Sequence, residues 1–360
     1  MQILSELFTT FIVAYLALTN GLANEINSWF IPGADNSPIY TEVETVEITR
    51  LPSQSDGIIP DVLLNSLAYQ QAAVAGATGL AGATTKDPFA ALVNIFCTMK
   101  TEEYIRTNTG TGFFVDPDGV IMTNAHVAQF LILEKTNDIG EVECIVRNGN
   151  PAAPKYKAEL LYISPTWIQE NAGVISDEIP MGTGERDYAL LYVKEALDDS
   201  PLPTVFPALG FNSDPLPLSI RDNLVVAAGY PVGPLLRESA SADLIPQKAT
   251  TTVSELYTFG SNNADVFSIR GSLVGTEGSS GGPVLNENGE VIGIIVTRGD
   301  DDTDGSGSLR AITISHIEKT MLEETNFDLT ENIAGDLPFR AEVFADTMTP
   351  FLLSLLETAN

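Results

Sequence analysis

Residues 275–296 read GTEGSSGGPVLNENGEVIGIIV, where two adjacent serines precede a glycine pair, a proline and the turn signal of a β-hairpin. Such a run of small residues is either a tight turn without function or a stretch of bare backbone that leaves room for a substrate beside Ser280. A serine hydroxyl is a poor nucleophile unless a base removes its proton. A functional role for Ser280 therefore requires a histidine, and a carboxylate that orients it, elsewhere in the chain.

The chain contains two histidines, His126 and His316. His126 follows a short apolar strand in GVIMTNAHVA, whereas His316 stands in ITISHIEKT and is expected at the surface, at the start of a helix. The carboxylate that stands out is Asp187 in GERDYALLYV, because the apolar strand after it would draw the side chain out of water. An ionised aspartate beside an imidazole holds the ring in one tautomer. His126, Asp187 and Ser280 are therefore the predicted catalytic residues.

The segments around these three residues, TNAHV, DYALL and GSSGGP, resemble the signatures of trypsin-like serine proteases. They follow the chymotrypsin order of histidine, aspartate and serine. Their residues, together with GTGFF at 110–114, most resemble those of the bacterial HtrA (Deg) branch. The resemblance covers roughly Pro88 to Glu323. It implies an all-β fold of two six-stranded antiparallel barrels, with the site in the cleft between them and a serine endopeptidase activity.

The resemblance also implies a role for each residue. Ser280 would attack the scissile carbonyl, His126 would take up its proton and pass it to the leaving amine, and Asp187 would stabilise the imidazolium. The backbone N–H groups of Gly278 and Ser280 would form the oxyanion hole. The two glycines after Ser280 would keep side chains out of the path of the substrate. A protein or peptide is then the expected partner, and no cofactor or metal is required.

Three departures from the family pattern stand out. His126 and Asp187 are 61 residues apart, which is long for the branch, so an insertion at 148–184 is expected to decorate the first barrel. Ser279 replaces the aspartate that digestive members pair with a newly cleaved amino terminus, so that activation is not expected. Only 37 residues follow Glu323, which is too few for the PDZ module of HtrA proteins.

Nine short apolar runs separated by turn residues support the all-β prediction. They cover 91–99, 110–115, 119–124, 142–148, 188–193, 223–230, 272–276, 290–296 and 309–314. The predicted organisation is a signal peptide or N-terminal anchor at 1–23, an extension and linker at 24–86 with a helix from Asp61, a first barrel at 87–200, a second barrel at 201–325, and a tail at 326–360 with a short packing helix.

Composition limits the partners and the compartment. The formal net charge of −30 would repel a phosphate backbone, so nucleic acid is not expected as a partner. An apolar run at 8–19 followed by GLA predicts export to the periplasm or the exterior, with no span in the mature chain. Because the first basic side chain is Arg50, an uncleaved anchor or a buried helix stays open. Cys97 and Cys144 fit no metal-ligand spacing and would be free to pair after export.

Two other functional readings are kept. Gly278, Ser280 and Gly282 also satisfy the esterase pattern G-x-S-x-G, with His316 and a carboxylate of 300–304 following in the esterase order. That elbow requires a helix after the serine, whereas this chain continues with Pro283 and a hairpin. The second reading is a protease-like barrel that binds peptides without turnover.

Charged residues near the end of the second barrel suggest further sites. Residues 300–305, DDDTDG, match the opening of a calcium loop, but the twelfth position is Ala311 instead of glutamate, which favours a solvated acidic hairpin. Arg298 and Arg310 flank the strands expected to wall the specificity pocket, where either would favour an acidic side chain or lie at the rim.

Overall fold

The computed structural model describes residues 48–51, 82–136, 140–176, 184–232 and 243–358. The predicted signal or anchor at 1–23 and the helix expected from Asp61 lie outside these residues. Residues Glu47–Asn360 belong to one compact unit. None of the described helices combines the length and the apolar character needed to cross a membrane.

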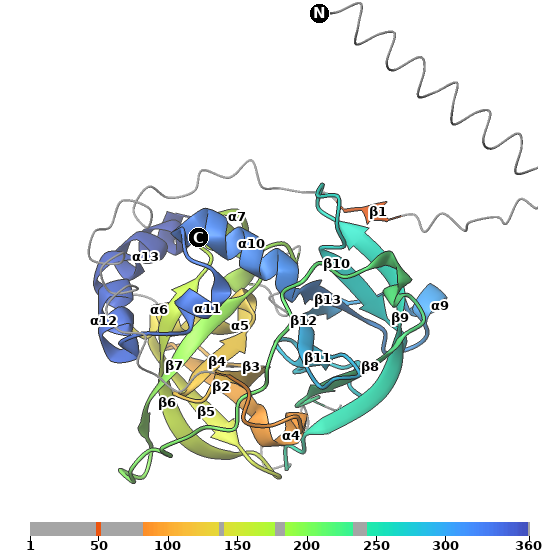
Figure 1. Cartoon of the computed structure of the whole chain (residues 1–360). Coiled ribbons are helices and arrows are strands. Elements are labelled where there is room, and N and C mark those ends of the chain that lie inside the picture. Colours follow the sequence, from red (N-terminus) through yellow and green to blue (C-terminus); the bar gives the residue numbers. More distant parts are fainter. Residues whose placement is uncertain (1–47, 52–81, 137–139, 177–183, 233–242, 359–360) are drawn as a thin grey trace, which may run out of the picture. The chain divides into compact units, whose positions relative to one another are not determined.

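The first barrel is a closed antiparallel sheet in the order β2-β3-β4-β7-β6-β5 (Figure 1). It closes because β2 pairs with β3 along one edge and with β5 along the other. Inward-facing Val, Ile, Leu and Phe side chains of these strands fill the interior. The strands are β2 Leu92–Lys100, β3 Ile105–Asp116, β4 Val120–Thr123, β5 Glu141–Asn148, β6 Ala153–Ile163 and β7 Ala189–Ala196.

The second barrel is an antiparallel sheet in the order β9-β10-β13-β12-β11-β8, and pairing of β8 with β9 closes it. A short strand from the N-terminal extension, β1 (Thr49–Arg50), adds to β9 in parallel. Both barrels are thus six-stranded, as the sequence predicts. The strands are β8 Leu224–Gly229, β9 Gln247–Thr258, β10 Val266–Ile269, β11 Pro283–Leu285, β12 Val291–Arg298 and β13 Leu309–Thr313.

Helices after the second barrel return to the first one. Helix α10 begins where the Thr313 side chain accepts a hydrogen bond from the His316 N–H, and it ends at Asn326 in a left-handed conformation. Helix α12 packs against β6 and β7, and α13 packs against α6 and α7 (Figure 1). The helices and 3-10 turns are α4 Pro88–Ala91, α5 Ala125–Ala128, α6 Phe130–Leu133, α7 Pro165–Asn171, η1 Ala172–Ser176, η2 Leu218–Ile220, α9 Asp301–Asp304, α10 Ile314–Thr325, α11 Leu329–Asn332, α12 Leu337–Thr347 and α13 Thr349–Thr358.

Several local predictions are confirmed and others are wrong. The turn at 286–289 joins β11 to β12, as the hairpin signal in 275–296 predicts, and a turn at 116–119 joins β3 to β4. The run at 272–276 is a turn and not a strand, because it wraps around the serine-bearing loop. Strand β6 lies inside the supposed insertion at 148–184 and is part of the barrel, so among the described residues of that segment α7 and η1 are the helical additions to it.

The acidic segment at 300–305 is not a hairpin. Asp301–Asp304 forms one helical turn, because the Asp300 carboxylate caps it at the Asp302 N–H. The Asp301 carboxylate is occupied by the N–H groups of Gly307 and Ser308. The described part of the chain holds no group of three or more side chains suited to a metal ion.

Cys97 and Cys144 form a disulfide that joins β2 to β5. The two residues are directly opposite in the antiparallel register, and both are buried. The bond closes a loop of 47 residues, which restricts the unfolded chain. The disulfide therefore stabilises the pairing of β2 with β5, which closes the first barrel.

Reduction of this disulfide should lower the free energy of unfolding by roughly 2 to 4 kcal/mol, because the unfolded chain regains the entropy of the open loop. Urea denaturation with and without reductant measures the difference. The doubly substituted Cys97→Ala, Cys144→Ala protein is the control, since reductant should leave it unchanged. Equal stability of the oxidised and reduced wild-type protein would contradict the expected role.

Asp116 is a buried carboxylate at the end of β3. One of its oxygens accepts a hydrogen bond from the Asp118 N–H at 2.8 Å, which shapes the turn to β4. Burial raises the pKa of Asp116 to about 6, and the Asp118 hydrogen bond only partly opposes this. The ionised form is therefore disfavoured in the folded protein relative to the unfolded chain.

Asp116→Asn should stabilise the protein by roughly 1 to 3 kcal/mol at pH 8, because asparagine keeps the acceptor and carries no charge. Since the folded pKa lies above the unfolded one, the stability contributed by protonated Asp116 is lost as the pH rises toward and through 6. The gain should thus grow between about pH 4 and 6, from the unfolded to the folded pKa, and then level off in urea unfolding experiments. A gain independent of pH, or one matched by Asp118→Asn, would contradict this assignment.

Candidate active site

His126 and Asp187 form a closed pair at the end of the first barrel. Strand β4 ends at Thr123, and the chain turns into α5, whose second residue is His126. The His126 Nδ1 lies 2.7 Å from Asp187 Oδ2, and the His126 backbone N–H donates to Asp187 Oδ1 at 2.9 Å. The Asn124 side chain donates to the Asp187 carbonyl at 2.8 Å. Both the carboxylate and the main chain of Asp187 are therefore fixed to the segment that carries His126.

Both neighbours of Asp187 are anchored on α10. The Tyr188 hydroxyl lies 2.8 Å from Thr320 Oγ1, and Arg186 forms ion pairs with Glu324 at 3.2 Å and with Glu323 at 3.3 Å. Arg186 has a φ of 57°, a left-handed conformation that few residues other than glycine adopt. The bonds to α10 hold this turn, and with it the carboxylate that faces His126.

Glu324 is the buried partner of Arg186 on α10. Its carboxylate accepts hydrogen bonds from Tyr162 and from Ser164 in addition to the Arg186 ion pair. Burial raises the pKa of Glu324, and Arg186 acts against that rise. Burial also acts to lower the pKa of Arg186, but Glu324, Tyr188, Tyr162 and Glu323 together outweigh it and raise that pKa. No local pattern in the sequence marks this pair, because its members are 138 residues apart.

The loop that carries Ser280 is held against the first barrel by Thr111. The Thr111 N–H donates to the Ser280 carbonyl at 2.8 Å, and the Thr111 hydroxyl donates to the Gly278 carbonyl at 2.6 Å. The same hydroxyl accepts from the Tyr230 N–H at 2.9 Å. Thr111 belongs to the GTGFF segment, so its neighbourhood was recognisable from the sequence although its role was not.

The glycine pair after Ser280 serves packing instead of substrate access, which corrects the expectation from the sequence. A Cβ at Gly281 would lie 2.0 Å from the Thr111 carbonyl oxygen, and one at Gly282 would lie 2.2 Å from the Ala228 carbonyl oxygen. Gly281 also has a φ of 85°. Any side chain here would push the serine loop away from both barrels.

The peptide group between Glu277 and Gly278 has a defined orientation. The Glu277 carbonyl accepts a hydrogen bond from the Val232 N–H at 2.5 Å. In a trans peptide the N–H points opposite to the carbonyl, so the Gly278 N–H faces away from Val232. Among the described residues, neither the Gly278 N–H nor the Ser280 N–H has a hydrogen-bond acceptor.

A pocket of about 160 Å³ brings these groups together. Its lining includes His126 from the first barrel and Gly278 and Ser280 from the second. Arg298 also lines it, whereas Arg310 does not and lies over the Tyr257 ring at 4.8 Å. Of the two arginines expected near a specificity pocket, the structure thus brings only Arg298 to it.

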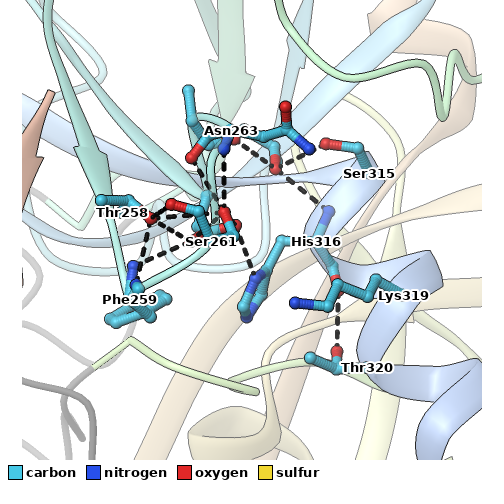
Figure 2. A network of polar contacts seen from close by, with 12 residues as sticks. Thr258, Phe259, Ser261, Asn263, Ser315, His316, Lys319 and Thr320 are labelled. Carbon is cyan, nitrogen blue, oxygen red and sulfur yellow. Dashed lines mark hydrogen bonds and ion pairs between the residues drawn. The ribbon is translucent and has the colours of Figure 1, made fainter. Parts of the chain in front are cut away.

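His316 lies outside this pocket and is buried, which corrects the expectation of a surface residue. Figure 2 shows it among polar contacts that join the turn after β9 to the first turn of α10. Its Nδ1 lies 3.1 Å from Asp265 Oδ1, and its ring packs against Phe259. Burial acts to raise the pKa of Asp265, but His316, Phe259 and Ser261 outweigh it and lower that pKa to about 2.

This placement bears on the esterase reading. The chain after Ser280 continues into strand β11, where an esterase elbow requires a helix. His316 is paired with Asp265 and not with a carboxylate of 300–304. The residues of the esterase reading are therefore not brought together.

Glu324→Gln should lower the free energy of unfolding by about 2 to 4 kcal/mol, because it leaves the buried Arg186 with only a half-exposed carboxylate. Glu323→Gln is the matched control, since it removes that half-exposed partner of the same arginine and should cost less than about 1 kcal/mol. Chemical denaturation of both variants measures the two losses. Equal losses would show that burial of Glu324 does not matter.

Comparison with known proteins agrees with this architecture. A family model described as a trypsin-like peptidase domain matches residues 110–294, which is just over half of the chain. Rat serine protease HTR4 is 26% identical over 261 residues, covering 71% of this chain and 41% of the relative. A probable periplasmic serine endoprotease DegP-like from Chlamydia pneumoniae is 27% identical over 190 residues, covering 51% of this chain and 28% of the relative.

The chain spans about two fifths or less of the length of these curated relatives. Among solved structures, the active form of the Rv3671c protease from M. tuberculosis is 18% identical, with a TM-score of 0.40. The match covers 82% of this chain and 93% of that chain. With the family model matched across both barrels, the chain belongs to the trypsin-like peptidase family.

Proposed function

We propose that the protein is a serine endopeptidase in which Ser280 is the nucleophile, His126 the general base and Asp187 the residue that orients it. The observation that carries the proposal is the double attachment of His126 to the fully buried Asp187, at the wall of the pocket that Ser280 also lines. The family match supports the same reaction class.

The hydrogen bonds favour the tautomer that the reaction needs. Donation of the Nδ1 proton to Asp187 leaves a lone pair on Nε2, which can accept the proton of the Ser280 hydroxyl. As Ser280 attacks the carbonyl, the imidazolium that forms lies beside a carboxylate, which stabilises it. The same proton then passes to the leaving amine, and water repeats the sequence on the acyl-enzyme.

The N–H groups of Gly278 and Ser280 are proposed as the oxyanion hole. Negative charge develops on the substrate oxygen as the carbonyl becomes tetrahedral, and fixed donors stabilise it without reorganising. The bond from Val232 to the Glu277 carbonyl supports this role, because it turns the Gly278 N–H outward. The φ of 88° at Gly278 would be strained for other residues.

The edge of β12 supports a peptide as the substrate. Strand β11 pairs with β12 only as far as Ile294, while β12 continues to Arg298. Beyond that point β12 keeps its partner β13 on the other side. Ile295, Thr297 and Arg298 line the pocket, so an extended peptide can add to this edge with its carbonyl near Ser280.

We further propose that the protein is exported. The Cys97–Cys144 disulfide supports this, because such bonds persist in oxidising compartments. One relative is named as periplasmic.

Ser280→Ala and His126→Ala should each lower turnover of a casein-like substrate by on the order of 10⁴ to 10⁶, because each removes a member of one catalytic unit. Ser279→Ala is the matched control; its hydroxyl is bonded to the Val274 carbonyl, and its loss should cost less than about tenfold. A fluorophosphonate probe with peptide mapping should label Ser280 alone.

His316→Gln separates this proposal from an esterase. It should leave turnover within about tenfold on both the casein-like substrate and a short-chain ester, provided that circular dichroism shows a folded protein. Loss of turnover in a folded His316→Gln, with activity retained in His126→Ala, would reject the proposed roles.

A further inference from the structure

We propose that Arg298 makes the pocket beside Ser280 select an acidic side chain, on the residue whose carbonyl Ser280 attacks. This inference rests on the proposed peptidase function and adds the substrate class to it. The pocket lining is mostly neutral and contains several threonines, an asparagine and apolar side chains. Its charged residues besides His126 are Arg298 and Glu277.

The position of Arg298 brings its charge within reach of the reacting bond. Ile295, three residues earlier on β12, accepts a hydrogen bond from the Gly281 N–H at 2.8 Å, directly after Ser280. Three strand residues span roughly 10 Å, which a long side chain can largely bridge. Arg298 is also exposed, so its guanidinium remains accessible to a ligand.

Arg298 has no carboxylate partner among the described residues, and the same is true of Arg310, whose guanidinium lies over the Tyr257 ring outside the pocket. Arg221 pairs with Glu255 at 2.5 Å, and Arg270 pairs with Asp222 at 3.7 Å. No ion pair joins Arg298 to any residue that the structure describes. The chain has 48 acidic residues, so the lack of a carboxylate partner for Arg298 does not reflect a shortage of carboxylates. The guanidinium is thus available to a carboxylate from outside.

An arginine suits this recognition because it presents two parallel N–H donors that match a carboxylate. In a pocket that partly excludes water, such a charge-assisted pair discriminates against a neutral isostere by roughly tenfold to a hundredfold. The net charge of the chain repels acidic peptides at long range, so the preference has to arise locally, at Arg298.

Glu277 is the opposing charge in the pocket and defines the rival outcome, a preference for basic side chains. Its carbonyl is bonded to Val232, and Glu277 is already engaged in a further interaction within the protein. No ion pair engages Arg298 among the described residues, so we expect its guanidinium to be the charge that meets the substrate. The rival predicts faster cleavage after lysine, which the same experiment measures.

The test uses three fluorogenic peptides that differ only in Glu, Gln or Lys before the cleaved bond. The wild-type protein should show a kcat/KM for the Glu peptide at least about tenfold above that for the Gln peptide. Arg298→Gln should bring this ratio to within about threefold of unity, chiefly by lowering kcat/KM for the Glu peptide. Arg298→Glu should favour the Lys peptide. Arg270→Gln, which removes the same charge outside the pocket, should keep the wild-type ratio.

A wild-type preference for Gln or Lys, or a Glu:Gln ratio that survives in Arg298→Gln, would overturn the inference and leave the peptidase proposal intact. If no peptide is cleaved, the peptidase proposal fails, and calorimetry with the Ser280→Ala protein decides the question of selectivity. The Glu peptide should then bind about tenfold more tightly than the Gln peptide, and Arg298→Gln should abolish the difference. Equal binding would overturn the inference.

Discussion

The contact between Thr111 and the loop that carries Ser280 is the constraint on which the geometry of the pocket depends. His126 and Ser280 belong to different barrels, so their relative position is only as well defined as the interface between those barrels. Thr111 is fully buried there and uses its N–H, its hydroxyl and its carbonyl, the last of which accepts from Thr123. A hydroxyl that both donates and accepts can hold Gly278 and Tyr230 together, which an apolar residue of the same shape cannot.

Three buried carboxylates, each with its own donors, organise this acidic chain. Asp187 holds His126, Glu324 holds Arg186, and Asp265 holds the turn before β10 and faces His316. Taking a charge out of water is costly unless donors replace the water, so each carboxylate strongly restricts where its partners can lie. The interior thus uses charge for positioning, while the pocket leaves one guanidinium open to solvent.

Much of the fold follows from local patterns in the sequence, whereas its long-range contacts do not. The turns at 116–119 and 286–289 carry their own turn chemistry. His126, Asp187 and Ser280 each lie in a motif next to a strand, His126 after β4, Asp187 before β7 and Ser280 before β11. The apolar pattern does not predict β9, because threonines and charges replace its apolar residues, and it does not predict β6, which lies in the segment expected to be an insertion. His316 was misplaced, since its burial depends on Asp265, 51 residues earlier.

Helix α10 follows both barrels in the sequence, yet it holds Arg186 and Tyr188, which lie on either side of Asp187. A ribosome completes every strand of the first barrel before it adds Ile314, the first residue of α10. Until then Arg186 and Tyr188 lack Glu324 and Thr320, and the turn that presents Asp187 is held from one side only. Domains generally begin to fold from the N-terminus during synthesis, so a nascent chain can hold a barrel before the pocket is complete. The turn that presents Asp187 to His126 thereby reaches its final set of contacts only after α10 has been synthesised.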